Sequence, residues 1–223
     1  MSKANPISRQ ADLPAGIFPN PQGDPPTKPI HKRTMIMADS KTAPKTDMAA
    51  KPQPKAISAS ATPAMGLSDL FEHALKDIYY AEKKIYKALP KMIKAAHDPD
   101  LKAALTHHRD ETAGHIETVE QVFELMGKRP KAEKCDAIDG ILEESTGLLE
   151  DFGNTPASDA AIIFSAQAVE HYEITRYGSM IAYAKALDLA EAADLLGTVL
   201  QQETTADHNL TALAEDRINA AAA

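Results

Sequence analysis

Residues 101–126 read LKAALTHHRDETAGHIETVEQVFELM, a stretch in which apolar side chains recur at helical spacing. Leu101, Leu105, Val119 and Val122 fall on one stripe, which is the pattern of an amphipathic helix that packs against other helices. The middle of this stripe is polar and carries His108, Glu111 and His115. Both ends of the helix are thus suited to a core, and its centre would bring titratable groups into that core.

The helical period continues from residue 66 towards the end of the chain, without the alternation typical of β-strands. It predicts long helices over residues 68–96, 98–126, 158–187 and 189–219, and a shorter helix over 137–152. We expect Ser68 to cap the first helix, Asp98 and Pro99 to start the second, and Asp188 and Glu191 to form a capping box at the last. The very short turns predict antiparallel hairpins. The domain is therefore expected to be an all-α, antiparallel four-helix bundle with one extra short helix.

Residues 1–64 have a different composition, with 11 of the 15 prolines, no glutamate and a single aromatic residue, Phe18. Such a segment buries too little apolar surface to offset its chain entropy. We therefore predict a disordered tail over residues 1–64 and a folded domain over 65–223. The tail carries nine Lys and Arg against four Asp, a net charge of +5. The net charge of the whole chain is −8, so residues 65–223 carry −13. Nucleic acid is not an expected partner of so acidic a domain, except through the basic tail.

Cys135 is the only cysteine, so no intramolecular disulfide can form and a reducing compartment is indicated. No apolar run approaches the roughly 20 residues that cross a bilayer. No secretory signal pattern is present either. We expect a cytoplasmic protein that does not bind membranes.

Each long helix carries a glutamate where its apolar stripe calls for a hydrophobic residue: Glu82, Glu111, Glu173 and Glu203. Glu82 lies 15 residues before the first turn, taken at residue 97, and Glu111 lies 14 after it. Glu173 and Glu203 each lie 15 residues from the second turn, taken at residue 188. All four are therefore expected in one layer. Buried carboxylates are rare unless they are paired or bound to metal.

Basic residues do not recur on these stripes, so metal is favoured over a layer of Lys or Arg pairs. Glu111 with His115, and Glu203 with Asp207, have a four-residue spacing that lets both side chains reach one centre. Glu170 lies one turn before Glu173 and is a further candidate. The predicted ligands are Glu82, Glu111, His115, Glu170, Glu173, Glu203 and Asp207. They suit two iron or manganese ions, with zinc as another option, and His108 is expected to support them from outside.

Five segments in order carry a family resemblance: LKDIYYAEKKIYKALPKM (75–92), HRDETAGHIE (108–117), KCDAIDGILEES (134–145), AQAVEHYEITRYGSM (166–180) and QQETTADHNL (201–210). They resemble the YciE/YciF-like bacterial stress proteins of the ferritin-like superfamily. The resemblance implies a ferritin-like bundle, a homodimer and a link to stress responses, and superfamily members bind two irons or manganeses. The chain departs from the common Glu-x-x-His pattern, because the spacing after Glu111 is one residue longer and Asp207 stands in place of the second histidine.

These observations favour a dinuclear metalloprotein that handles O₂ or peroxide in protection against oxidative stress, and a di-metal oxidoreductase is the enzyme class that they suggest. Two alternatives remain open. One is a non-enzymatic metal-binding or structural stress protein. The other is a stress protein that associates with DNA through its basic tail. Iron-dependent loss of peroxide would favour the first function, and salt-dependent DNA retardation that disappears without residues 1–64 would favour the last.

The composition of residues 1–64 predicts how the chain responds to limited proteolysis. Cleavage should leave a fragment that begins near residue 60–66, because compact elements resist proteases better than disordered segments. The fragment should keep its helicity by circular dichroism, its melting temperature and its metal content, since every predicted ligand lies beyond the cleavage point. A fragment that unfolds or loses metal would show that the tail is part of the fold.

Overall fold

The computed structural model describes residues 65–223, so the predicted tail over 1–64 lies outside the described residues. The helices are α1 (Leu67–Ala95), α2 (Pro99–Leu125), α3 (Asp136–Phe152), α4 (Ser158–Ala186), α5 (Ala190–Leu213) and the short α6 (Asn219–Ala222). A π-helical segment (Ala214–Ile218) separates α5 from α6, where the sequence predicts a continuous helix to residue 219. No strand occurs in residues 65–223, which confirms the all-α prediction.

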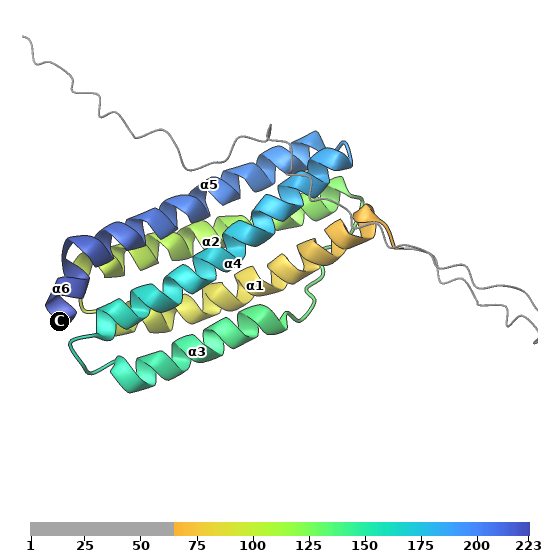
Figure 1. Cartoon of the computed structure of the whole chain (residues 1–223). Helices are drawn as coiled ribbons and strands as arrows, with labels where there is room; N and C mark the ends of the chain where they lie inside the picture. The colour runs from red at the N-terminus through yellow and green to blue at the C-terminus, as the bar shows by residue number, and fades with distance from the viewer. Residues whose placement is uncertain (1–64) are drawn as a thin grey trace, which may run out of the picture. The chain divides into compact units, whose positions relative to one another are not determined.

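α1, α2, α4 and α5 form the antiparallel four-helix bundle that the sequence predicts (Figure 1). α1 packs against α2 and α4, and α5 packs against α2 and α4. α2 ends at the opposite end of the bundle from the start of α4, so the connection between them must span the whole length of the bundle. α3 makes this crossover, packed against α1 and α4. The extra short helix is thus what allows two hairpins to join into one bundle.

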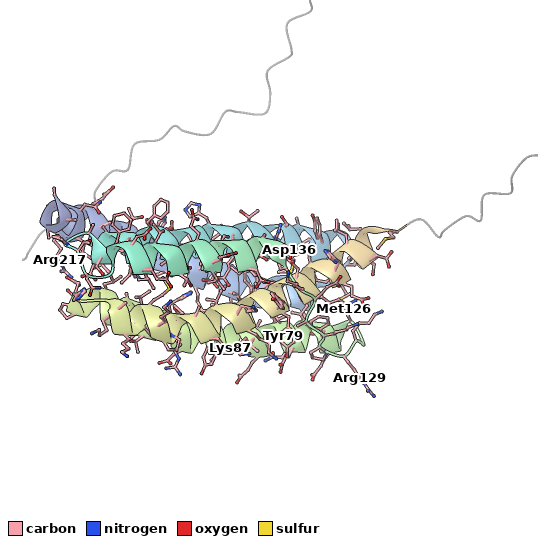
Figure 2. All side chains as sticks on the ribbon, turned by 90° about the horizontal axis from the view of Figure 1, so that it is seen from below. Tyr79, Lys87, Met126, Arg129, Asp136 and Arg217 are labelled. Carbon is pink, nitrogen blue, oxygen red and sulfur yellow. The ribbon has the colours of Figure 1, made fainter. Side chains whose placement is uncertain are left out.

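The turn between α1 and α2 is fixed by side chains from distant parts of the chain. Asp98 caps α2 as predicted, because its carboxylate accepts hydrogen bonds from the backbone N–H groups of Asp100 and Leu101. Asp159 at the start of α4 accepts from the backbone N–H groups of His97 and Asp98, each at 2.8 Å. Arg217 binds the Asp98 carboxylate with two nitrogens at 2.9 and 2.7 Å. Figure 2 shows Arg217 at one end of the bundle and Arg129, which follows α2, at the other.

Two predicted helix caps are wrong. At α1 the cap is Gly66, whose N–H donates to the Asp69 carboxylate, and the Ser68 side chain caps nothing. At α5 the N-cap is Leu189, with no side-chain hydrogen bond, so Asp188 and Glu191 form no capping box. Asp188 instead has φ +59° and ends α4. The Leu189 N–H donates to Ala184 O at 2.9 Å, the bond that closes a helix with a left-handed residue.

The core is built from the apolar stripes of the long helices. The helical period places seven residues of α1 on its inward stripe, and all are buried: Phe71, Leu75, Ile78, Glu82, Ile85, Leu89 and Met92. The seven of α4 are also buried: Ile162, Ala166, Val169, Glu173, Tyr177, Met180 and Ala184. α2 and α5 differ from the predicted inward stripe near their centres, where Glu111 and Asp207 are only partly buried. Thr112 is fully buried beside Glu111. The inward face of α2 therefore runs through His108, Thr112 and His115, and this phase decides which polar groups reach the centre.

Candidate metal centre

One layer of titratable side chains lies midway along the bundle, at the level that the sequence predicts. All four long helices contribute to it. We call the set the Glu–His layer, and its residues are at most 5% exposed: Glu82 from α1, His108 and His115 from α2, Glu170 and Glu173 from α4, and Glu203 from α5. So many buried ionisable groups are costly unless they are paired with one another or with metal.

The Glu–His layer contains two groups of side chains at metal-ligand spacing. One group comprises His108, Glu170, Glu173 and Glu203, and the other comprises Glu82, His115 and Glu203. Within each group, one ligand atom from each residue lies within 4.8 Å of all the others. Glu203 belongs to both groups. Its carboxylate therefore lies between them, where a ligand shared by two ions would be.

Many ligand atoms of the layer lack a hydrogen-bond partner among the described residues. Both carboxylate oxygens of Glu173 and Glu203, both ring nitrogens of His108 and Nδ1 of His115 are buried without a hydrogen bond of acceptable geometry. One oxygen of Glu82 and one of Glu170 share this condition. Buried polar atoms are almost always paired in native proteins. Their concentration here fits a site that binds cations.

His115 is the main counter-ion of the layer in the metal-free chain. Its Nδ1 lies 2.9 Å from Glu203 Oε1 and 3.7 Å from Glu82 Oε1. Burial alone would lower the pKa of His115, but the interactions with Glu203 and Glu82 outweigh burial and raise this pKa to about 10. Burial likewise acts to raise the pKa of Glu203, yet the neighbouring His115 and His108 hold it below its ordinary value. One imidazolium thus stabilises one ionised carboxylate.

Glu170 and Glu173 have no such compensation. Burial raises the pKa of both carboxyl groups well above the ordinary value, and the negative charge of Glu203 raises it further. His108 Nε2 lies 3.4 Å from Glu170 Oε1, which is the nearest basic group to that carboxyl. Without a metal, these two glutamates are held in a place that favours their protonated forms.

Tyr177 holds one of the ligand candidates, Glu82, in position. Tyr177 is fully buried, and its hydroxyl donates to Glu82 Oε1. Burial and the charge of Glu82 raise the pKa of Tyr177 well above its ordinary value, so the hydroxyl keeps its proton and acts as a donor. One Glu82 oxygen is therefore engaged by Tyr177, and the other remains available to a cation.

Gln202 fixes the orientation of the His115 ring. Gln202 Nε2 donates to Glu111 Oε1 at 3.3 Å, and Gln202 Oε1 lies 3.2 Å from His115 Nε2. A carboxylate only accepts hydrogen bonds, so the amide must point its oxygen towards His115. Nε2 of His115 then carries a proton. Nδ1, which faces Glu82 and Glu203, is left as the nitrogen that can bind a metal.

The structure brings together five of the seven predicted ligands, namely Glu82, His115, Glu170, Glu173 and Glu203. Glu111 and Asp207 lie outside both groups. The Glu111 side chain is 19% exposed, and its Oε1 lies 3.3 Å from His107 Nε2 on the surface. Asp207 accepts a hydrogen bond from Gln167 at 3.0 Å and lies 3.4 Å from His171. Both sit at the edge of the layer.

His108 is the site residue that the sequence-based prediction placed outside the ligand set. It lies on the inward face of α2, one helical turn before Thr112, and belongs to the larger group. The segment Thr112-Ala-Gly-His115 has the Glu-x-x-His spacing with threonine in place of glutamate, and Glu203-Thr-Thr-Ala206 has it with alanine in place of histidine. Glu170 supplies the carboxylate that is missing at Thr112, and His108 supplies the imidazole that is missing at Ala206. The layer thus keeps the four glutamates and two histidines of the common dinuclear bundle site.

This arrangement defines the chain as a ferritin-like four-helix bundle with a buried Glu–His layer, the class of protein that the sequence predicts. The chain belongs to the family described as a domain of unknown function, DUF892, which matches residues 66–223. It is 39% identical to protein YciF of Escherichia coli (strain K12) over 154 residues, which are 69% of this chain and 93% of the relative. The predicted resemblance to the YciE/YciF-like proteins is confirmed.

The solved structures that are similar to this chain include two relatives at 38–43% identity. The E. coli stress protein YciF has a TM-score of 0.67 at 38% identity, covering 70% of this chain and 99% of the other. YcfI from Rhodopseudomonas palustris, to which a structural role has been ascribed, has a TM-score of 0.65 at 43% identity, covering 68% of this chain and 96% of the other. Within residues 65–223, no helix has the length and apolar character needed to cross a membrane.

The opposite pKa shifts of Glu173 and Glu203 predict opposite effects of removing their charges from the metal-free protein at pH 7. A raised carboxyl pKa destabilises the fold above the ordinary value, so Glu173→Gln should increase the free energy of unfolding by about 1–3 kcal/mol. A lowered pKa stabilises the fold over the same range, so Glu203→Gln should decrease it by about 1–3 kcal/mol. Urea unfolding after EDTA treatment measures both.

Glu117→Gln, at an exposed position of α2, is the matched control and should change stability little. The gain from Glu173→Gln should grow as the pH rises above 4.5, the ordinary value for this group, because the unfolded parent then releases a proton that the folded parent retains. A loss of stability in Glu173→Gln would mean that this carboxyl has a structural role in the metal-free fold.

Proposed function

We propose that this protein holds a dinuclear iron or manganese centre in the Glu–His layer and uses it to react with O₂ or peroxide during stress. The observation that carries the proposal is the set of four buried glutamates and two buried histidines whose ligand atoms are largely unpaired. In a low dielectric, two like charges 4 Å apart repel by about 4 kcal/mol at an effective dielectric constant of 20. Four carboxylates carry −4, and two divalent cations would neutralise them.

The two groups assign the ligands of each ion. Glu82 and His115 would hold one ion, His108, Glu170 and Glu173 would hold the other, and Glu203 would be shared. Oxygen donors mixed with imidazole suit iron and manganese, and they also accept zinc. The layer has as many imidazoles as it has groups, so each ion would receive one nitrogen ligand.

Bound iron or manganese would supply the one-electron changes that the reduction of O₂ or peroxide requires. The chain itself performs three tasks. It excludes bulk water, because every residue of the layer is at most 5% exposed. Tyr177 keeps one oxygen of Glu82 in a fixed position, and Gln202 keeps Nδ1 of His115 turned inward. Held in this way, the ligands need little rearrangement to bind an ion.

The relatives support the stress-related part of the proposal and also a second candidate. E. coli YciF is described as a stress protein. The structural role ascribed to the R. palustris protein favours a non-enzymatic function for the family. A purely structural bundle gives no reason for Glu173, which is fully buried with neither oxygen paired among the described residues. We therefore rank the metal centre first, and we propose a cytoplasmic homodimer as its setting.

Metal content tests the proposal directly. Protein purified from cells supplied with iron or manganese should contain about two metal ions per chain by elemental analysis. Glu203→Gln removes the shared ligand and should weaken metal binding at least about tenfold, whereas the exposed control Glu117→Gln should not. The loaded protein should consume peroxide faster than the metal-free protein does.

Metal-free protein from supplemented cells, with no uptake when iron or manganese is added, would contradict the metal centre and favour the structural candidate. Full metal content without consumption of peroxide or O₂ would favour a metal-binding protein that is not an oxidoreductase.

A further inference from the structure

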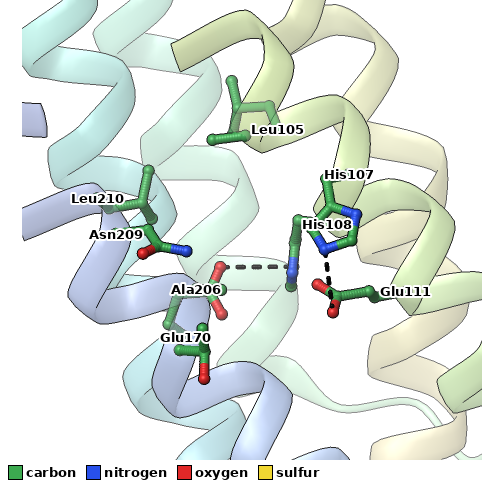
Figure 3. Close-up of a pocket in the computed structure, with 10 residues that line it drawn as sticks. Leu105, His107, His108, Glu111, Glu170, Ala206, Asn209 and Leu210 are labelled. Carbon is green, nitrogen blue, oxygen red and sulfur yellow. Dashed lines mark ion pairs between the residues drawn. The ribbon is translucent and has the colours of Figure 1, made fainter. Parts of the chain in front are cut away.

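A pocket between α2 and α5 reaches the Glu–His layer from the surface (Figure 3). Its cavity volume is about 60 Å³, with walls that include Leu105, Ala206 and Leu210. His108 and Glu170 form its inner end, where His108 Nε2 lies 3.4 Å from Glu170 Oε1. A water molecule in a cavity needs roughly 10–15 Å³. The pocket therefore has room for a few water-sized molecules in direct contact with two ligand candidates.

The mouth of the pocket is polar and exposed. His107 is 73% exposed, and its Nε2 lies 3.3 Å from Glu111 Oε1. Both residues line the pocket, so a path leads from this pair inward to His108, whose side chain is 7% exposed. Glu111 is thus a carboxylate at the start of the path, where an incoming cation would meet it first. This location accounts for a polar residue on α2 that lies outside both ligand groups.

A second approach to the layer is much narrower. A second pocket also touches His108 and Glu170, but its volume is about 10 Å³ and its walls are apolar side chains such as Leu89, Met92 and Leu142. A cavity of that size holds at most one water molecule. A hydrated cation would have to lose most of its water along these apolar walls before it reached His108 or Glu170. The pocket between α2 and α5 is the better route.

We infer that the pocket between α2 and α5 is the access route of the metal centre, and that it admits metal ions and small ligands of hydrogen peroxide size while excluding bulkier organic hydroperoxides. The inference rests on the proposed function, and it adds the route and the size class of the substrate. Ala206 has a central place in it. Its methyl group is one wall of the pocket, and a larger side chain at this position would fill the space in front of Glu170.

Cobalt(II) uptake by the metal-free protein tests the route without relying on activity. Bound cobalt(II) gives a visible spectrum, so stopped-flow absorbance measures the rate of uptake and titration measures its final amount. Ala206→Leu should slow uptake at least about tenfold and leave the final amount unchanged. Ala212→Leu, at an exposed position of the same helix, is the matched control and should take up cobalt at the parent rate.

Ala104→Leu narrows the same pocket from α2 and should slow uptake as well, which keeps the test valid if Ala206→Leu does not fold. Glu111→Gln should slow uptake several-fold at low ionic strength, because it removes the negative charge at the mouth of the pocket. Parent-rate uptake in both blocked variants would overturn the route. A parent protein that binds no cobalt would instead contradict the proposed function itself.

The size limit is tested with two ligands that share a carboxylate and differ in bulk. Formate should change the visible spectrum of the cobalt-loaded protein, and benzoate at the same concentration should not. Ala206→Gly widens the pocket and should increase the response to benzoate. An equal response of the parent to formate and benzoate would overturn the size limit.

Discussion

The structure depends on one electrostatic constraint, the burial of four carboxylates in a single layer of the bundle core. His115 compensates part of this charge by contact with Glu203 and Glu82. Glu170 and Glu173 remain without an adequate counter-charge, and burial raises the pKa of each. An apolar layer would be more stable in a bundle of this size, since replacing buried ions by hydrophobic residues is often neutral or stabilising. The layer is therefore explained by something it binds rather than by its contribution to folding.

The helices serve this layer through their pairing. Each hairpin has a tight turn, so the midpoints of its two helices face each other, and the crossover helix α3 lets the second hairpin pack on the first with its own midpoint at the same level. Two neighbouring side chains then orient the ligand candidates: Tyr177 donates a hydrogen bond to Glu82, and Gln202 contacts the His115 ring. The layer is closed on most sides. The pocket between α2 and α5 opens it towards solvent beside Glu111, which gives the site both a dry interior and a path to it.

The sequence predicts the helices well and the ligand set only in part, because the two rest on signals of different strength. Long apolar stripes set the helices, and they place Glu82, Glu173 and Glu203 in the core. On α2 the neighbouring residues Glu111 and Thr112 at the centre of the stripe are both polar, so the apolar period does not decide which of them faces the core. The structure turns Thr112 inward. That phase brings in His108 and leaves Glu111 at the mouth of the pocket. Asp188 shows a similar limit, since its left-handed backbone serves the end of α4 and a cap pattern cannot reveal this.

Anomalous diffraction from crystals of the iron- or manganese-loaded protein, recorded at the absorption edge of the metal, tests most directly whether the Glu–His layer binds two ions. A dinuclear centre should give two peaks about 3.5–4 Å apart. One should lie between Glu82, His115 and Glu203, and the other between His108, Glu170, Glu173 and Glu203. The Glu203 carboxylate should lie between the two peaks, and Glu111 and Asp207 should be too far from either peak to be ligands. A loaded crystal whose only peaks lie on the surface would contradict a metal centre in the Glu–His layer.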